Sequence, residues 1–102
     1  MQIELSGHHV EITDAIREAV KSRFNKIESH YPQLDSVSLT LTVEPNVQSA
    51  EATTQYLGAT LAVKAEGQEM YAVIADAAKK LDSALSHRKG AQTSHRPKAA
   101  NM

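Results

Sequence analysis

Basic side chains recur at helical spacing in two separate stretches of the chain. The first stretch carries three of them, spaced by three and four residues: Arg23, Lys26 and His30. In the second stretch, Lys80 and His87 form a similar row with Ser83, Lys79 lies further around the helix, and Arg88 and Lys89 lie at its end. Such spacing brings side chains onto one face of a helix, where a row of positive charges can match the phosphates of a nucleic acid. If the two helices lie side by side, the rows predict one cationic surface for a polyanionic partner.

A plainer explanation fits the same pattern. Lysine and arginine solvate exposed helix faces, and cations near a helix C-terminus complement the macrodipole, which accounts for Arg88 and Lys89 without a ligand. The net charge is −1, but residues 1–78 hold five Lys and Arg against eleven acids, whereas residues 79–102 hold six against Asp82 alone. This asymmetry favours a polyanion at one edge of the molecule, and a solvated basic tail would produce it equally well.

No other residues have the spacing of a catalytic or metal site. His8 and His9 are adjacent, unlike the ligands of a purpose-built zinc site, so a metal bound there would be adventitious. The chain has no cysteine, no glycine-rich phosphate loop and no nucleophile elbow. We therefore expect a protein that is not an enzyme and that uses no cofactor and no metal.

Length and composition are those of one small globular domain. Of the 102 residues, 41% are hydrophobic and 23% are charged, and no apolar run approaches the roughly 20 residues of a membrane span. The N-terminal residues lack the layout of a signal peptide, and the absence of cysteine suits a reducing compartment. The expected location is the cytoplasm.

The first half of the chain predicts a strand, a helix and a second strand. Residues 2–6 alternate between apolar and polar side chains. Thr13 is then placed to cap a helix over residues 14–30, whose apolar side chains recur at spacings of four and three and which Pro32 ends. Residues 36–44 alternate strictly, which is typical of a strand with one buried face.

The second half predicts a hairpin and a second helix. Residues 52–57 and 59–66 form the hairpin, after a loop that follows the preceding strand. The second helix is expected to begin near Glu69 and to end before Gly90. Residues 91–102 have nothing to bury, and we expect them to form a disordered basic tail.

The order β-α-β-β-β-α predicts an α/β two-layer sandwich over residues 1–90. A right-handed strand–helix–strand crossover makes strands one and two parallel, and the remaining strands form an antiparallel meander. Both helices then cover one face of the four-stranded sheet, as in a double-stranded-RNA-binding domain. The other face, rich in serine and threonine, is poor material for an obligate interface, so the free protein is expected to be a monomer.

Two segments at the starts of the helices carry a recognisable sequence. Val10-Glu11-Ile12-Thr13 precedes the first helix, and Ala65-Glu66-Gly67-Gln68-Glu69-Met70-Tyr71-Ala72 enters the second. They resemble the hibernation-promoting factor and ribosome-associated inhibitor family. The resemblance runs from Met1 to Lys89, and the second motif is the more specific. The short basic tail suits the short hibernation-promoting subtype.

The resemblance implies a function at the ribosome. Family members occupy the decoding channel of the small ribosomal subunit, contact 16S rRNA and exclude messenger RNA and transfer RNA. Translation is thereby inhibited reversibly in stationary phase or stress, and inactive ribosome dimers are promoted. The partners implied are the small subunit and the whole ribosome, with a second ribosome modulation factor as a further candidate.

The resemblance also points to the rRNA-contacting residues. The family's contacts come largely from basic helix residues, and four positions match: Arg23, Lys26, Lys80 and Lys89. The two rows add four further expected rRNA contacts: His30, Lys79, His87 and Arg88. Ser83 stands where relatives often carry arginine and His87 where lysine is usual, so contact along the second helix should be weaker.

Two other readings remain open from the residues alone. A generic double-stranded-RNA-binding module would contact successive minor grooves of any A-form helix and would bind free duplex as tightly as ribosomes. A small hydrolase or transferase would need a pocket with strongly perturbed acids or histidines, for which the sequence offers no candidate.

Overall fold

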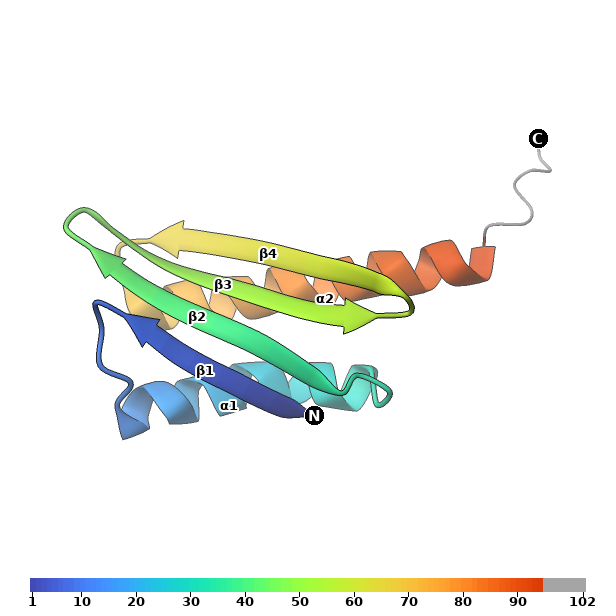
Figure 1. Cartoon of the computed structure of the whole chain (residues 1–102), viewed down its shortest axis with the longest axis horizontal. Coiled ribbons are helices and arrows are strands. Elements are labelled where there is room, and N and C mark those ends of the chain that lie inside the picture. Colours follow the sequence, from blue (N-terminus) through green and yellow to red (C-terminus); the bar gives the residue numbers. More distant parts are fainter. Residues whose placement is uncertain (95–102) are drawn as a thin grey trace.

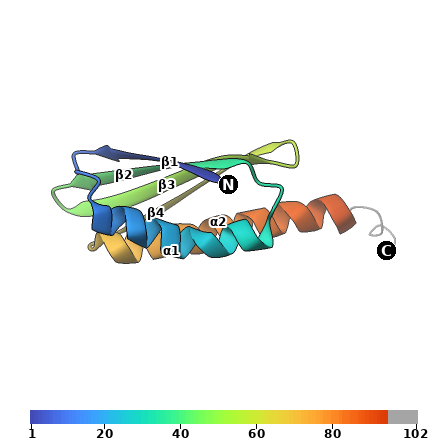
Figure 2. The same ribbon diagram turned by 90° about the horizontal axis from the view of Figure 1, so that it is seen from below.

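The computed structural model describes residues 1–94 and has two layers. Its elements follow the predicted order: β1 (Gln2–His8), α1 (Asp14–His30), β2 (Ser36–Glu44), β3 (Val47–Tyr56), β4 (Ala59–Gly67) and α2 (Met70–Ser94). Figure 1 shows the sheet in front of the helices, and Figure 2 shows both helices beneath the same face of the sheet. The predicted α/β sandwich is therefore confirmed.

The sheet has the predicted topology. Its strand order is β1-β2-β3-β4; β1 pairs parallel to β2, while β2, β3 and β4 form an antiparallel meander. The strict alternation of β2 buries Val37, Leu39 and Leu41 completely. The two helices add the other half of the core, with Phe24 and Leu81 also fully buried.

Local side-chain contacts fix where both helices begin. The hydroxyl of Thr13 accepts a hydrogen bond from the Ile16 amide at 3.2 Å, so the predicted N-cap of α1 is confirmed. At the start of α2 the carboxylate of Glu69 caps the helix, because it accepts hydrogen bonds from the backbone amides of Tyr71 and Ala72 at 3.0 and 3.1 Å. Its negative charge also suits the N-terminal end of the helix dipole.

Two strand boundaries differ from the prediction. β1 continues to His8 instead of ending at residue 6, because its ladder with β2 extends to the pair His8 and Thr42. β3 begins at Val47, so the predicted loop shrinks to a two-residue turn at Pro45 and Asn46. In both places pairing with β2 extends the strand over residues that do not alternate clearly between apolar and polar side chains.

The end of α2 also differs. The helix runs through Gly90 to Ser94, so the disordered tail predicted from residue 91 does not begin there. A single glycine costs a helix only about 1 kcal/mol, and no proline follows until Pro97. The rest of the predicted tail lies outside the described residues.

Candidate nucleic-acid interface

A groove runs between α1 and α2 on the side of the molecule away from the sheet. It measures about 510 Å³ and is lined by four residues from each helix: Ser22, Arg23, Lys26 and Ile27 of α1, and Ala75, Ala78, Lys79 and Asp82 of α2. Two alanines on the α2 wall leave space between the helices. The groove therefore contains cations from both of the basic stretches seen in the sequence.

Packing of the apolar stripes places these cations at the groove. Phe24 and Ile27 of α1 are buried against the sheet and α2, so Arg23 and Lys26, each next to one of them in the sequence, emerge beside the buried stripe. On α2, Lys79 follows the buried Ala78 in the sequence and likewise emerges beside the buried stripe of its helix. The structure thus brings Arg23 and Lys26 of the first row together with Lys79, which the sequence placed further around the second helix than its row.

The three groove cations carry charge that no acid in the described part of the chain pairs with. The ion pairs found there join the N-terminal ammonium to Glu28, His30 to Asp82 and Lys64 to Glu66. Arg23, Lys26 and Lys79 are all exposed. Three unpaired, exposed cations along one groove can each meet a phosphate of a polyanionic ligand.

Lys80 lies elsewhere. Its Nζ donates to the carbonyl oxygen of Lys64 on β4 at 2.9 Å. It lines a second, shallow hollow with Val63, Asp76 and Ser83, which Lys79 also borders, and it does not line the groove. The sequence predicted a row led by Lys80 facing the row of α1. The structure instead brings Lys79 to α1 and turns Lys80 toward the edge of the sheet, because adjacent residues differ by about 100° around a helix.

His30 and Lys89 lie beyond the groove, near the end of α1. Nδ1 of His30 is 3.6 Å from Oδ2 of Asp82, an ion pair only when the imidazole is protonated. Nζ of Lys89 is 6.0 Å from the centre of the Tyr31 ring, which is within range of a cation–π contact. These two predicted site residues therefore border the groove without lining it.

Arg88 and His87 are separated from the groove. Arg88 is half-buried and donates to the carbonyl oxygen of Leu57, in the turn between β3 and β4. His87 is exposed on the last part of α2. Of the eight predicted site residues, three line the groove; the remaining five lie around it or on other sides of α2.

Two residues of this region were not predicted. Asp82 lines the groove as its one acid, and Tyr31 donates to it through the phenolic hydroxyl. Burial, together with the hydrogen bond and charge of Asp82, raises the pKa of Tyr31, partly offset by a hydrogen bond with Ser86. Asp82 was visible in the sequence as the only acid after residue 78, but nothing there linked it to Tyr31.

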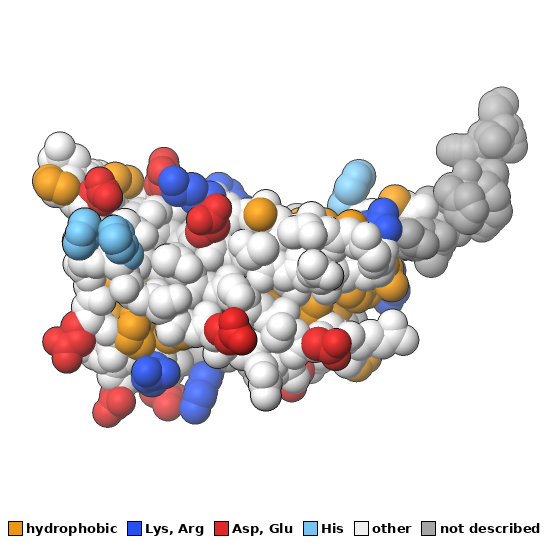
Figure 3. All heavy atoms as spheres, viewed as in Figure 1, with side chains coloured by type: hydrophobic (Ala, Val, Ile, Leu, Met, Phe, Trp, Pro, Cys, Tyr) orange, Lys and Arg blue, Asp and Glu red, His pale blue; other side chains and the backbone are white. Residues whose placement is uncertain are grey.

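The opposite face of the molecule has different chemistry. The open side of the sheet is mostly uncharged and polar, with scattered charges of both signs (Figure 3). Lys64 on this face pairs with Glu66 at 3.4 Å, and Ser38 donates to Glu4 at 3.3 Å. Among the described residues, this open face of the sheet has no row of cations, so the helix side is the better candidate for binding nucleic acid.

The described residues form neither a metal-binding cluster nor a membrane-spanning helix. Within the described residues, no three His, Cys, Asp or Glu side chains are placed to hold a metal ion, although the rings of His8 and His9 lie 4.1 Å apart. None of the described helices is long and apolar enough to cross a membrane.

Comparison with known proteins shows relatives over nearly the whole chain. The family model described as Sigma 54 modulation protein / S30EA ribosomal protein matches residues 3–93. A relative from Azotobacter vinelandii, named ribosome hibernation promoting factor, is 39% identical over 92 residues, which cover 90% of this chain and 86% of the relative. A relative of the same name from Salmonella typhimurium is 37% identical over 95 residues, 93% of this chain and 100% of the relative.

Solved structures agree with the fold. A ribosomal subunit interface protein from Coxiella burnetii superposes with a TM-score of 0.82 at 23% identity, covering 88% of this chain and 99% of that one. The N-terminal domain of Protein Y from Thermus thermophilus superposes with a TM-score of 0.77 at 27% identity, covering 86% and 99%. By its sequence match and its fold, the chain belongs to the Sigma 54 modulation protein / S30EA ribosomal protein family.

Proposed function

We propose that this protein is a ribosome hibernation factor that binds the small ribosomal subunit through the groove between α1 and α2. The observation that carries the proposal is the convergence of Arg23, Lys26 and Lys79 along one groove, exposed and unpaired. The relatives named ribosome hibernation promoting factor supply the biological setting. The protein acts by binding, as a non-enzymatic factor in the cytoplasm.

The proposed site on the ribosome is the decoding channel, where 16S rRNA supplies the phosphates. A protein seated there excludes messenger RNA and transfer RNA, so translation stops while the ribosome stays intact. The inhibition is reversible because no covalent bond is made or broken. Inactive ribosome dimers, with or without a second ribosome modulation factor, are the proposed downstream result. The free protein is a monomer.

The electrostatics give this proposal a measurable signature. Each phosphate neutralised by a Lys or Arg releases counterions, and contributes a slope of about −0.7 to −0.9 to a plot of log affinity against log salt. Three groove cations therefore predict a slope of about −2 to −3 from the groove alone. A binding mode without phosphate contacts would show almost no slope.

Two assays with purified ribosomes test the proposal. In sedimentation, the protein should travel with small subunits and whole ribosomes at low salt and dissociate as salt rises. In cell-free translation, stoichiometric protein should lower output, and dilution should restore it. Binding to free duplex RNA as tight as binding to ribosomes would instead support the generic double-stranded-RNA module. Output that stays low after dilution would contradict reversible hibernation.

A further inference from the structure

Asp82 is an unexpected residue in a groove that binds phosphate. It lines the groove together with Arg23, Lys26 and Lys79, and about a third of its side chain remains exposed. By charge alone, a carboxylate in this position repels a polyanion and weakens its binding. A benefit that offsets this repulsion must come from the contacts of Asp82 within the protein, where two side chains at the end of α1 bind the carboxylate.

That contact joins the end of α1 to α2. The phenolic hydroxyl of Tyr31 lies 3.0 Å from Oδ1 of Asp82 and 3.3 Å from the backbone carbonyl oxygen of the same residue. His30 approaches the second carboxylate oxygen at 3.6 Å. Tyr31 is the C-cap of α1, so these contacts tie the last turn of one groove wall to the middle of the other.

The ring of Tyr31 is held in place by the sheet. Only 6% of the residue is exposed, and its ring makes an edge-to-face contact with Tyr56 of β3, with ring centres 5.7 Å apart. A ring fixed between the sheet and α2 gives its hydroxyl little freedom to move. The hydrogen bond to Asp82 thus connects α2 to a rigid point of the core.

The position of this tie relates it to the groove cations. Asp82 stands three residues after Lys79 on α2, and Tyr31 stands five after Lys26 on α1. Apolar packing between helices permits small shifts of one helix along the other, whereas a hydrogen bond has a narrow range of distance and angle. The tie therefore limits the shift of α2 along α1, and with it the distance from Lys79 to Lys26 and Arg23.

We infer that Tyr31 and Asp82 are positioning residues for ribosome binding: their contact holds the cations of α1 and α2 at the separation that matches the bound phosphates. The inference rests on the proposed function. Neither residue needs to touch RNA. The carboxylate is kept in a cationic groove because the alignment gained outweighs the repulsion that its charge adds.

Two variants separate alignment from charge. Tyr31→Phe removes the hydroxyl but keeps the ring against Tyr56 and changes no charge near neutral pH. Asp82→Asn removes the negative charge but keeps an Oδ1 oxygen that can accept from Tyr31. If alignment matters, Tyr31→Phe weakens small-subunit binding about fivefold, the equivalent of one ordinary hydrogen bond, and Asp82→Asn binds at least as tightly as the native protein.

The salt dependence distinguishes positioning from simple loss of stability. Both variants are measured well below their unfolding temperatures, with the folded fraction checked by circular dichroism. A misaligned groove reaches fewer phosphates at once, so the slope for Tyr31→Phe should become shallower by up to about 0.9. A merely less stable protein that remains folded would keep the native slope.

Lys26→Glu, measured in parallel, separates this inference from the proposed function. If Lys26→Glu weakens binding but Tyr31→Phe binds with native affinity and native salt slope, the positioning role is wrong and the groove proposal stands. If Lys26→Glu also binds like the native protein, the groove proposal itself fails. If Tyr31→Phe and Asp82→Asn both bind at least as tightly as the native protein, the contact between the two residues contributes nothing to alignment and the positioning role is overturned.

Discussion

Arg88 of α2 donates from Nε to the carbonyl oxygen of Leu57 at 3.2 Å, and its Nη2 donates to the same oxygen. That oxygen belongs to the two-residue turn between β3 and β4. Leu57 and Gly58 have φ angles of 51° and 79°, both in the left-handed region that two-residue hairpin turns require. Arg88 therefore has a structural contact that the sequence did not predict.

The first prediction follows from this contact. Arg88→Gln should lower the free energy of unfolding by about 1 kcal/mol, because a charge-assisted hydrogen bond at a partly exposed site is lost. Small-subunit binding should weaken less than it does for Lys26→Glu. Urea unfolding and equilibrium binding measure the two effects. The neighbouring exposed change His87→Gln is the control, and it should alter stability by less than about 0.5 kcal/mol.

The second prediction concerns Leu57 itself. A leucine in the left-handed region costs about 1–2 kcal/mol, and Leu57 is 37% exposed, so packing offsets only part of this cost. Leu57→Asn creates the Asn-Gly pair favoured in such turns and should raise the free energy of unfolding by about 1 kcal/mol. The carbonyl that accepts from Arg88 is retained. A lower midpoint of thermal unfolding would show that the leucine side chain stabilises the hairpin more than its backbone strains it.

The third prediction compares two neighbouring threonines of β3. The hydroxyl of Thr54 is buried and donates to the carbonyl oxygen of Ser36 on β2. Thr54→Val keeps the shape but leaves this carbonyl without its partner, so the free energy of unfolding should fall by about 1–3 kcal/mol. Thr53→Val is the matched control on the open face. Equal effects from the two changes would mean that the buried hydrogen bond contributes nothing.

The fourth prediction concerns alkaline pH. Burial and the Asp82 carboxylate raise the pKa of Tyr31 above its ordinary 10.0 in the folded protein. The folded state thus keeps this proton to higher pH than the unfolded chain, and the stability it contributes is fully present below about pH 10 and lost as pH rises through the folded pKa. Urea unfolding across this range should show a decline that Tyr31→Phe reduces. A native decline matched by the variant would assign the effect to other groups.

Much of the fold could be predicted because its signals are local. The alternation of Ser36–Glu44 and the spacing of apolar residues in α1 each indicate one element without reference to the rest of the chain. The start of β3 at Val47 could not be predicted in this way, because its first residues are ordered by pairing with Glu44 and its neighbours on β2. The end of α2 was also mispredicted, because Gly90 alone does not stop a helix and no proline follows it until Pro97.

The site was predicted less completely, for a geometric reason. Helical spacing identifies which cations share a face, but not how far a helix is rotated against its neighbour. Packing of Ala78 and Leu81 sets that rotation and turns Lys79, instead of Lys80, toward α1. The contact between Tyr31 and Asp82 spans 51 positions, and no single-sequence pattern connects residues so far apart.

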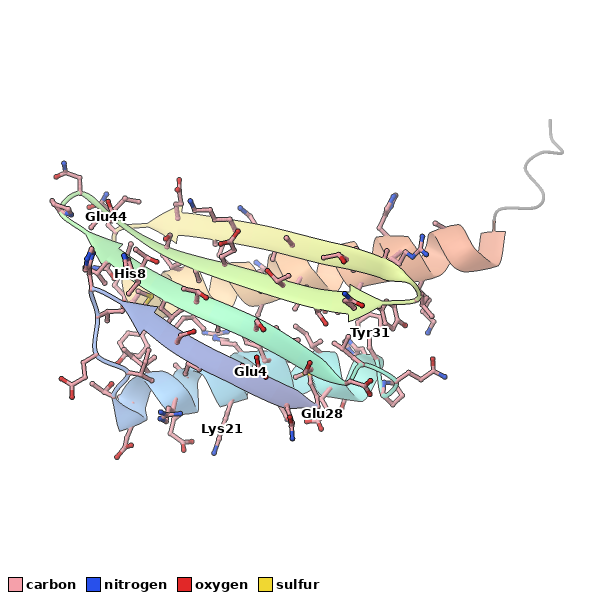
Figure 4. All side chains as sticks on the ribbon, in the orientation of Figure 1. Glu4, His8, Lys21, Glu28, Tyr31 and Glu44 are labelled. Carbon is pink, nitrogen blue, oxygen red and sulfur yellow. The ribbon has the colours of Figure 1, made fainter. Side chains whose placement is uncertain are left out.

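We propose that the groove cations, and not positive charge in general, bind the small subunit. Lys21 is the natural control, because it is an exposed lysine of the same helix that points away from α2 (Figure 4) and lines a separate hollow with Glu28. Lys26→Glu and Lys21→Glu change the net charge equally. Neither residue has a salt bridge in the described chain, so both variants should fold.

Equilibrium binding of these two variants to purified small subunits is the most direct test. Lys26→Glu should weaken binding at least about tenfold, the loss expected for a charged contact turned repulsive, and should make the salt slope shallower by about 0.9. Lys21→Glu should stay within about twofold of the native protein, since only long-range attraction is reduced. Equal losses from the two substitutions, or no loss from Lys26→Glu, would mean that the groove between α1 and α2 is not the binding surface.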